Sequence, residues 1–187
     1  AIGGIGLIKD YKKMITMDFK KPGNIVYVIG KTEGHLDQSV FAKELLNEKK
    51  GAPPSVNLFN EKNIGETLLK LIDLDLIVSC HDISLGGILT AVSKMCIKGN
   101  KGIKINPFKG LINKYEYFFG EDQGRYIIEI EKDNFKNVAE ILEKNSIHYD
   151  NLGIINDNQL IIDEKSKVPI DELIISHTNW LSEYMSK

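Results

Sequence analysis

A short apolar segment that runs into a glycine-containing turn constrains the fold of this chain most. Leu76–Cys80 predicts a strand, residues 81–87 (His-Asp-Ile-Ser-Leu-Gly-Gly) predict a turn, and Ile88 opens a helical pattern that runs to Lys98. Glycines let a backbone approach a ligand closely, and the first turn of a helix leaves N–H groups unpaired at its positive end. The stretch therefore predicts a strand–turn–helix unit that could hold an anion.

Two interpretations of this turn are open from the residue types alone. In the functional one, Asp82 binds Mg²⁺, Ser84, Gly86 and Gly87 surround a nucleotide phosphate, and His81 adds a polar contact. In the structural one, Ser84 caps the helix, the glycines make a tight turn, and His81 and Asp82 are a polar strand end.

An acidic turn at Gly120–Arg125 is the second candidate. Glu121, Asp122, Gln123 and Arg125 could recognise hydroxyl, amide and phosphate groups, although a solvated turn with an ordinary ion pair is the favoured interpretation of these residues in isolation. Gly34–Ser39 could likewise cradle an anion, but a capped helix start is favoured there. Each stretch alone is therefore a weak signal.

Composition excludes several classes of function. The 187 residues carry a formal net charge of −2, which argues against a nucleic-acid surface, and no apolar run is long enough for a membrane helix. Two cysteines give no disulfide framework and suit a reducing cytosol. Histidines and cysteines show no zinc spacing, and Cys80 cannot pair with His81 because neighbours on a strand point to opposite faces.

Predicted strands and helices alternate, which indicates an α/β or α+β domain whose helices cover a sheet. We expect the aromatic residues 115–119 to form a loop and the last helix to cover the core. The expected strands are 25–30, 76–80, 102–106, 126–131, 147–155 and 159–163, and the expected helices are 38–47, 57–72, 87–98, 133–144 and one from 171 onward.

Five segments in one order together resemble a known family. They are Ile-Gly-Gly-Ile-Gly-Leu at 2–7, Gly-His-Leu-Asp-Gln-Ser at 34–39, Gly-Ala-Pro-Pro at 51–54, Cys-His-Asp-Ile-Ser-Leu-Gly-Gly at 80–87 and Phe-Gly-Glu-Asp-Gln-Gly-Arg-Tyr at 119–126. This order resembles the C-terminal part of the synthetase subunits of phosphoribosylformylglycinamidine synthase (the PurL family), within the AIR synthase-related superfamily. The resemblance extends over nearly the whole chain.

The resemblance implies a fold and a domain division. Residues 21–187 are expected to form an AIR synthase C-terminal-like domain, a three-layer structure with a mixed sheet, and residues 1–20 the tail of a preceding N-terminal-like domain. The glycine-rich start, without an initiator Met, suggests a segment of a longer chain. The expected partners are the rest of the synthetase chain, a glutaminase subunit and a small accessory subunit, in the cytoplasm.

The implied reaction is that of an ATP-dependent carbon–nitrogen ligase, which uses MgATP and glutamine-derived ammonia to convert formylglycinamide ribonucleotide to its amidine in purine biosynthesis. Asp82 matches a position that binds Mg²⁺ in the family's first half, and Glu121-Asp122-Gln123 aligns with a substrate loop. This chain matches the second half, whose nucleotide site is thought to be structural. Leu85 stands where Asp is usual there, and Asp37 where Gly is usual.

Two functional hypotheses follow. In the first, the chain is a piece of the synthase, contains none of its catalytic residues and is inactive alone. In the second, the domain is a non-catalytic scaffold that packs on the catalytic half and docks the glutaminase. Selenophosphate synthetase, thiamine monophosphate kinase and the hydrogenase maturation dehydratase share the implied fold, but their loops fit less well.

Overall fold

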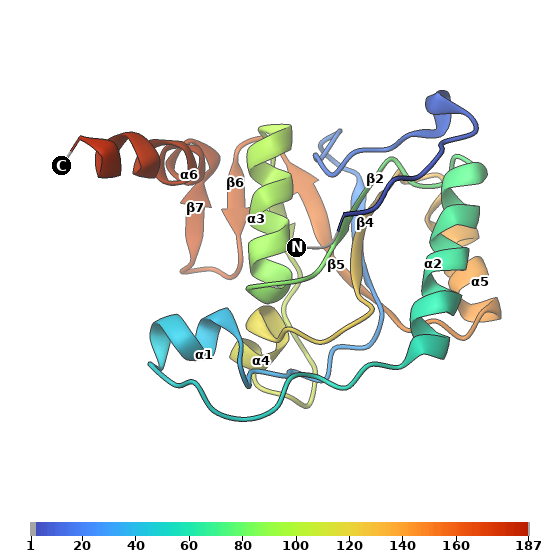
Figure 1. The fold of residues 1–187 in the computed structure, drawn as a ribbon. Coiled ribbons are helices and arrows are strands. Elements are labelled where there is room, and N and C mark those ends of the chain that lie inside the picture. The colour runs from blue at the N-terminus through green and yellow to red at the C-terminus, as the bar shows by residue number, and fades with distance from the viewer. Residues whose placement is uncertain (1–2, 187) are drawn as a thin grey trace.

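The computed structural model describes residues 3–186, which form a seven-stranded mixed sheet with helices on both faces (Figure 1). Strand order across the sheet is β2-β4-β1-β5-β3-β6-β7, and every neighbouring pair is antiparallel except β3 and β6. The strands are β1 (Ile25–Ile29), β2 (Ser79–Asp82), β3 (Gly102–Ile105), β4 (Tyr126–Ile130), β5 (Tyr149–Asn156), β6 (Gln159–Ile161) and β7 (Lys167–Pro169).

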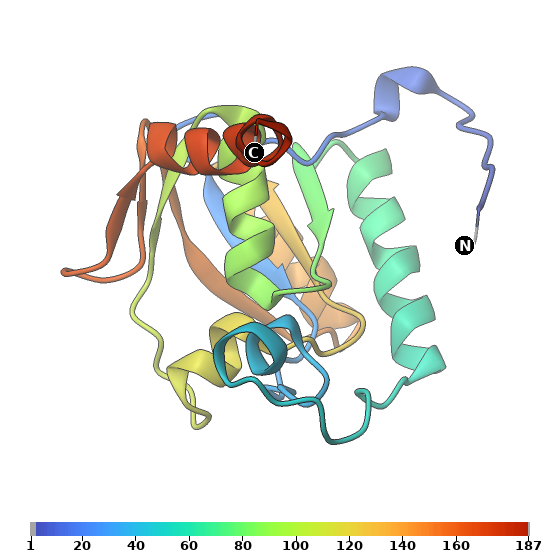
Figure 2. The same ribbon diagram turned by 60° about the vertical axis from the view of Figure 1, so that its left-hand side comes forward.

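Six α-helices and one short 3-10 helix complete the described chain. They are η1 (Tyr11–Lys13), α1 (Val40–Leu45), α2 (Leu58–Asp73), α3 (Gly87–Gly99), α4 (Lys114–Phe119), α5 (Phe135–Lys144) and α6 (Ile170–Met185). Helices α3 and α4 and the first turn of α6 pack on one face of the sheet, whereas α2 and α5 pack on the other (Figures 1 and 2). The predicted three-layer α/β fold with a mixed sheet is therefore confirmed.

Strand β1 divides the core into its two halves. Val26 and Val28 point into the cluster beneath α3, while Tyr27 and Ile29 point into the cluster beneath α2 and α5. This alternation follows from the two-residue period of a strand, and all four side chains are buried because helices cover both faces. A near-continuous apolar run is therefore what this central position requires.

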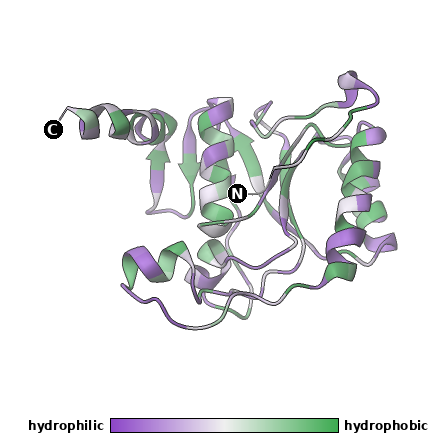
Figure 3. Ribbon diagram, in the orientation of Figure 1, coloured by the Kyte–Doolittle hydropathy of each residue, from purple (hydrophilic) through white to green (hydrophobic). Residues whose placement is uncertain are grey.

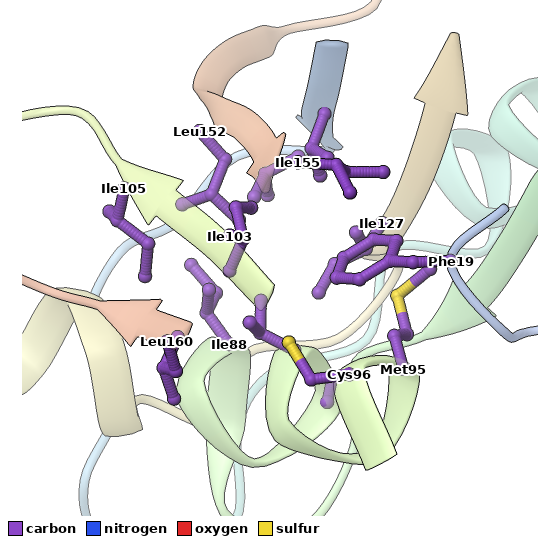
Figure 4. Packing of buried hydrophobic residues seen from close by; sticks show 14 of the residues in the cluster. Phe19, Ile88, Met95, Cys96, Ile103, Ile105, Ile127, Leu152, Ile155 and Leu160 are labelled. Atoms are coloured by element: carbon purple, nitrogen blue, oxygen red, sulfur yellow. The ribbon is translucent and has the colours of Figure 1, made fainter. Parts of the chain in front are cut away.

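The cluster beneath α3 also fixes the entry segment of the chain. Phe19 is buried beside Met95 and Ile127, as Figure 4 shows, and its N–H donates to the Met95 carbonyl at 3.3 Å. Each fully buried apolar side chain of this size contributes about 1.5–3 kcal/mol relative to exposure. The described residues before Phe19 contribute no buried side chain.

Several helices begin at a residue whose side chain accepts a hydrogen bond from the first turn of the helix. Ser39 Oγ accepts from Ala42 N–H at 3.1 Å to start α1, and Asn57 Oδ1 accepts from Asn60 N–H at 3.1 Å to start α2. The sequence offers Asp37 or Ser39 as the first cap and Asn57 as the second; the structure selects Ser39 and confirms Asn57. The helix that ends at Gly99 is followed by Asn100 in the left-handed conformation, with φ of 48°.

Two local expectations are wrong. Residues 115–119 form most of α4 rather than a loop, because Asn113 and Glu116 make a reciprocal capping box at its start. The strand expected over 76–80 begins only at Ser79 and runs to Asp82, because pairing with β4 starts there. Strand β7 was not expected at all.

Helix α6 covers the core only with its first turns. Ile170 is buried and Leu173 and Ile174 pack against the α3 cluster, but Trp180 and Tyr184 are 60% and 67% exposed. Figure 3 shows hydrophobic residues recurring along the projecting part of this helix. The expectation that the last helix covers the core therefore holds for its first turns and not for its second half.

Candidate functional site

The turn after β2 and the acidic turn before β4 lie together at one end of the sheet. Asp82 is the register partner of Tyr126, and the N–H of Ile83 donates to the Arg125 carbonyl at 2.9 Å. Antiparallel pairing places the end of β2 beside the start of β4, so the two turns must meet. The structure thus brings together the two stretches that carried the main functional expectation.

Glu121 joins these turns directly. Its Oε1 accepts from the N–H of Gly86 at 2.8 Å and from the N–H of Val40 at 2.8 Å. These donors stand at the starts of α3 and α1, where N–H groups have no partner within the helix. A carboxylate of the chain itself therefore takes the place that an external anion was expected to take at the Gly86 N–H.

Asp122 fills the other glycine turn in the same way. Its Oδ2 accepts from the N–H groups of Glu33 and Gly34 at 3.2 and 3.0 Å, and its Oδ1 accepts from the N–H of His35 at 3.1 Å. Asp122 is 7% exposed, so these hydrogen bonds lie largely out of water. Three successive backbone donors around one carboxylate form an anion nest.

Arg125 is buried beneath the acidic turn and holds it through hydrogen bonds. It is 1% exposed, its Nε donates to the Asp122 carbonyl at 3.2 Å, its Nη1 donates to Thr32 Oγ1 at 3.1 Å and its Nη2 donates to the Gly120 carbonyl. Burial lowers the pKa of the guanidinium, and the nearby Asp122 carboxylate opposes that shift. The guanidinium is thus engaged by the chain itself.

Glycine is required where the strand–turn–helix unit meets α4. Gly87 has φ of +69°, and a Cβ there would lie 2.7 Å from the Phe118 carbonyl oxygen. Gly86, with φ of +83°, is the N-cap of α3, so the interpretation of Ser84 as the helix cap is wrong. Sequence reasoning missed Gly30, where a Cβ would lie 2.3 Å from the Gly124 carbonyl oxygen, although a glycine directly after a buried strand was a signal.

The other predicted side chains of the turn differ in accessibility. The His81 side chain is 15% exposed, and its Nε2 is buried without a hydrogen-bond partner within residues 3–186. His81 Nδ1 lies 3.1 Å from Asp82 Oδ1, and the Asp82 side chain is 61% exposed. Burial lowers the pKa of His81, Lys94 lowers it further, and Asp82 opposes both. Ser84 and Gln123 are exposed, and within residues 3–186 neither side chain makes a hydrogen bond.

Asp82 could serve Mg²⁺ only as a single carboxylate. Within residues 3–186, no group of three or more His, Cys, Asp or Glu side chains could hold a metal ion. Since Mg²⁺ in nucleotide sites commonly uses one or two protein carboxylates together with phosphate oxygens and water, Asp82 fits this ion only when a phosphate accompanies it. Leu85 is 66% exposed, so it adds an apolar side chain to the surface of the turn after β2.

Cys80 lies on the opposite face of the sheet from His81. It packs with the cluster beneath α2 and α5, and burial together with the charge of Asp82 raises the pKa of its thiol to about 12. A thiol with so high a pKa is almost wholly protonated at neutral pH and is a poor nucleophile. The structure therefore agrees with excluding a Cys80–His81 nucleophilic pair.

A cavity of about 710 Å³ opens beside the acidic turn. Its walls come from the turn at Gly34–Asp37, the first turn of α2 with Asn57 and Glu61, and the segment Asp122–Gly124. The turn at Ser84–Gly87 contributes no wall to it. The two converging turns therefore touch each other without sharing this cavity.

Comparison with known proteins identifies a family model and close relatives. Residues 21–165 match the family described as "AIR synthase related protein, C-terminal domain". The chain is 65% identical over 185 residues to phosphoribosylformylglycinamidine synthase subunit PurL of Pelagibacter ubique (strain HTCC1062). These aligned residues make up 99% of this chain and 25% of that protein. The PurL subunit of Rhodopseudomonas palustris (strain HaA2) is 33% identical over 186 residues, again over 25% of its length.

Solved structures show the same fold. PurL of Thermotoga maritima complexed with FGAR superposes with a TM-score of 0.71 at 20% identity, over 88% of this chain and 30% of that one. The T. maritima structure named PurLQS gives a TM-score of 0.69 at 18% identity. The chain thus spans about a quarter of the curated relatives it matches. These matches agree with the resemblance carried by the five segments.

Proposed function

Because the chain belongs to the AIR synthase-related family through its C-terminal domain, we propose that it serves as such a domain in the synthetase subunit of phosphoribosylformylglycinamidine synthase. The observation that carries this proposal is the 65% identity to a PurL subunit over 185 residues. The proposed division places residues 21–187 in this domain and residues 1–20 in the tail of a preceding one. The family match begins at residue 21, which supports that division.

In this proposal the longer enzyme is an ATP-dependent carbon–nitrogen ligase of purine biosynthesis. ATP phosphorylates the amide oxygen of formylglycinamide ribonucleotide, and ammonia from glutamine displaces the phosphate, which yields formylglycinamidine ribonucleotide, ADP and phosphate. The T. maritima PurL structures complexed with FGAR and with ATP support this substrate class. Mg²⁺ would accompany the nucleotide.

The proposed partners are the rest of the synthetase chain, a glutaminase subunit and a small accessory subunit, in the cytoplasm. Within the described part of the chain, no helix is both long enough and apolar enough to cross a membrane. The name PurLQS of a structural relative supports an assembly of subunits for that relative. The projecting apolar end of α6 offers contact area for such partners.

The structure limits which proposed site residues are free to meet a ligand. Asp82 as a Mg²⁺ ligand, with Ser84 and Gln123 as polar contacts, remains the proposed ligand-facing set, because these three residues are exposed. His81 was also proposed as a polar contact, but its Nδ1 lies against Asp82 and its Nε2 is buried. Gly86, Gly87, Glu121, Asp122 and Arg125 were also proposed to contact phosphate or substrate. The hydrogen bonds of the last three lie within the domain.

That observation favours the second candidate function, a scaffold half of the synthase. Glu121 and Asp122 place carboxylates on the backbone donors that a phosphate would need at Gly86 and at Gly34. A bound phosphate there would have to displace a carboxylate from its hydrogen bonds and would be repelled by its charge. In this version the domain supports the catalytic half and supplies no group to the reaction.

The test is amidine formation from formylglycinamide ribonucleotide, ATP and glutamine by the full-length synthase that contains this chain. We expect turnover by the full-length enzyme and none by residues 1–187 alone. Turnover by the 187-residue chain would overturn the proposal that it is one part of a longer catalyst.

Two variants of the full-length enzyme separate a working site from a scaffold. Asp82→Asn removes the proposed Mg²⁺ ligand while keeping its shape, and Lys98→Gln, at an exposed position near the far end of helix α3, is the control for a charge change. If the domain is a scaffold, both variants keep near-normal kcat and KM. A loss of more than tenfold in kcat for Asp82→Asn alone, with unchanged stability, would favour a working site.

A further inference from the structure

A second cavity, of about 520 Å³, lies away from the acidic turn. It opens between the loop that follows β3 (residues 106–112), α4 and the segment that begins β5 (residues 148–152). Among residues 3–186, only Lys31 lines both this cavity and the larger one. The ligand-facing set proposed above contributes nothing to its walls.

Much of the wall is flat and apolar. The rings of Phe108 and Tyr117 stack with centroids 4.2 Å apart and an interplanar angle of 26°, and Ile112 and Leu152 contribute aliphatic side chains. Cavities of this size with apolar walls and a few polar groups are typical of sites for small organic molecules. The polar groups then decide which molecule is bound.

Tyr117 supplies a polar group that lacks a partner. The residue is 6% exposed and lines the cavity, yet its hydroxyl makes no hydrogen bond within residues 3–186. It is not a buried atom without a partner, since within residues 3–186 only His81 Nε2 is one, so the hydroxyl oxygen keeps some access to solvent and is available to a ligand. Burial and the charge of Asp150 raise its pKa, so the hydroxyl stays protonated and can donate.

Asp150 supplies the complementary acceptor. It pairs in register with Val28, whose side chain lies in the cluster beneath α3, so Asp150 points to the same face of the sheet as Tyr117. Its carboxylate makes no hydrogen bond within the described residues and lies 3.5 Å from His148 Nε2. Lys31 Nζ lies 2.7 Å from Glu33 Oε1 in an exposed ion pair. The cavity therefore presents a donor and an acceptor beside a flat apolar wall.

We propose that this cavity binds a planar ring that carries an N–H next to a carbonyl group, with Tyr117 donating to the carbonyl and Asp150 accepting from the N–H. The ring lies against the wall formed by Phe108, Ile112 and Leu152. An edge of this kind meets both the hydroxyl of Tyr117 and the 40%-exposed carboxylate of Asp150, which a purely apolar ligand does not. The assignment does not depend on the proposed synthase function.

The test uses 2-pyridone, a small ring with this edge, and N-methyl-2-pyridone, which has the same shape without the N–H. Each is titrated into the ¹⁵N-labelled 187-residue chain while amide resonances are followed. We expect 2-pyridone to shift the resonances of residues 106–112 and 148–152 saturably, and the N-methyl compound to bind about fivefold more weakly or worse. Equal binding of both compounds, or shifts elsewhere only, overturns the assignment.

Variants add an independent check. Tyr117→Phe and Asp150→Ala are each expected to weaken 2-pyridone about fivefold, and Asp37→Asn, which lines only the larger cavity, to leave it unchanged. Unchanged affinity in both Tyr117→Phe and Asp150→Ala overturns the roles given to these residues. If Tyr117→Phe does not fold, the comparison of the two ring compounds on the unsubstituted chain still decides the outcome.

Discussion

The Nδ2 of Asn24 donates to Oε1 of Glu129 at 2.7 Å, joining two residues that are far apart in the sequence and both buried. The same carboxylate accepts from the backbone N–H groups of Lys20 and Lys21 at 2.8 and 3.1 Å and from Ser79 Oγ at 3.1 Å. Glu129 is 0% exposed. One carboxylate on β4 thus holds both the segment that leads into β1 and the first residue of β2.

Glu129→Gln should destabilise the fold substantially. The amide keeps the shape but replaces one acceptor oxygen with an NH₂ group that faces donors, so buried donors lose their partner. We expect a loss of about 2–3 kcal/mol in the free energy of unfolding, measured by urea denaturation. Glu131→Gln, at an exposed position just after the same strand, is the control and should change it by less than about 0.5 kcal/mol.

Glu121→Ala should loosen the starts of α1 and α3 together. Removing the carboxylate leaves the N–H groups of Gly86 and Val40 without their shared acceptor, at a cost of about 1–3 kcal/mol. Hydrogen exchange at these two amides is expected to speed up, whereas Glu140→Ala on the solvent side of α5 should leave it unchanged. Exchange as slow as in the unsubstituted chain would mean that these donors do not depend on Glu121.

Two glycine-to-alanine substitutions should shift stability in opposite directions. Gly87→Ala places a Cβ 2.7 Å from the Phe118 carbonyl oxygen at a residue with positive φ, and we expect a loss of about 2–4 kcal/mol. Gly65→Ala lies inside α2 with open space around the new Cβ, and we expect a gain of about 0.5–1 kcal/mol. Thermal unfolding of both variants and the unsubstituted chain measures the two changes in stability. A Gly87→Ala protein as stable as the unsubstituted chain would refute the close packing of α3 against α4.

The two cysteines should resist thiol reagents in the folded state. Burial raises the pKa of both Cys80 and Cys96 to about 12, with the charge of Asp82 adding to the shift at Cys80. We expect negligible labelling by a thiol reagent at pH 8 until the chain is unfolded in urea, when both thiols react. Rapid labelling of either thiol in the folded chain at this pH would contradict the burial.

The same shifts predict how stability changes at high pH. The folded-state pKa lies above the unfolded value near 9.0, so the unfolded chain loses these protons first. The contribution is complete below pH 9 and is lost as the pH rises toward about 12. Urea midpoints measured from pH 8 upward should therefore fall, and Cys96→Ala should reduce the slope of that fall.

Local sequence signals predicted much of the fold. Asn57 starts α2 and Ser39 starts α1 because a cap acts on N–H groups only two or three residues away. The turn before α3 was predicted from its two glycines, although the helix cap is Gly86 rather than Ser84. Helix α4 was missed even though Asn113 and Glu116 provided a local capping signal, because the aromatic run was interpreted as a loop.

The contents of the candidate site could not be predicted in the same way. Each glycine turn was identified as a potential anion site, but only the assembled sheet places Glu121 and Asp122 on the donors of those turns. The role of Glu129 depends on donors from two distant segments, so no pattern around residue 129 reveals it. Tyr117 stood in an aromatic run, and nothing in the sequence indicated that this residue would line a cavity.

The place of β1 between β4 and β5 has a consequence for how the chain acquires its structure. β1 is made before both strands that pair with it, and about a hundred residues separate it from β4. Until they emerge from the ribosome, an exposed apolar segment with unpaired backbone groups must be kept from joining other nascent chains. We therefore expect yield in a cell to depend on chaperone supply more than equilibrium stability alone would suggest.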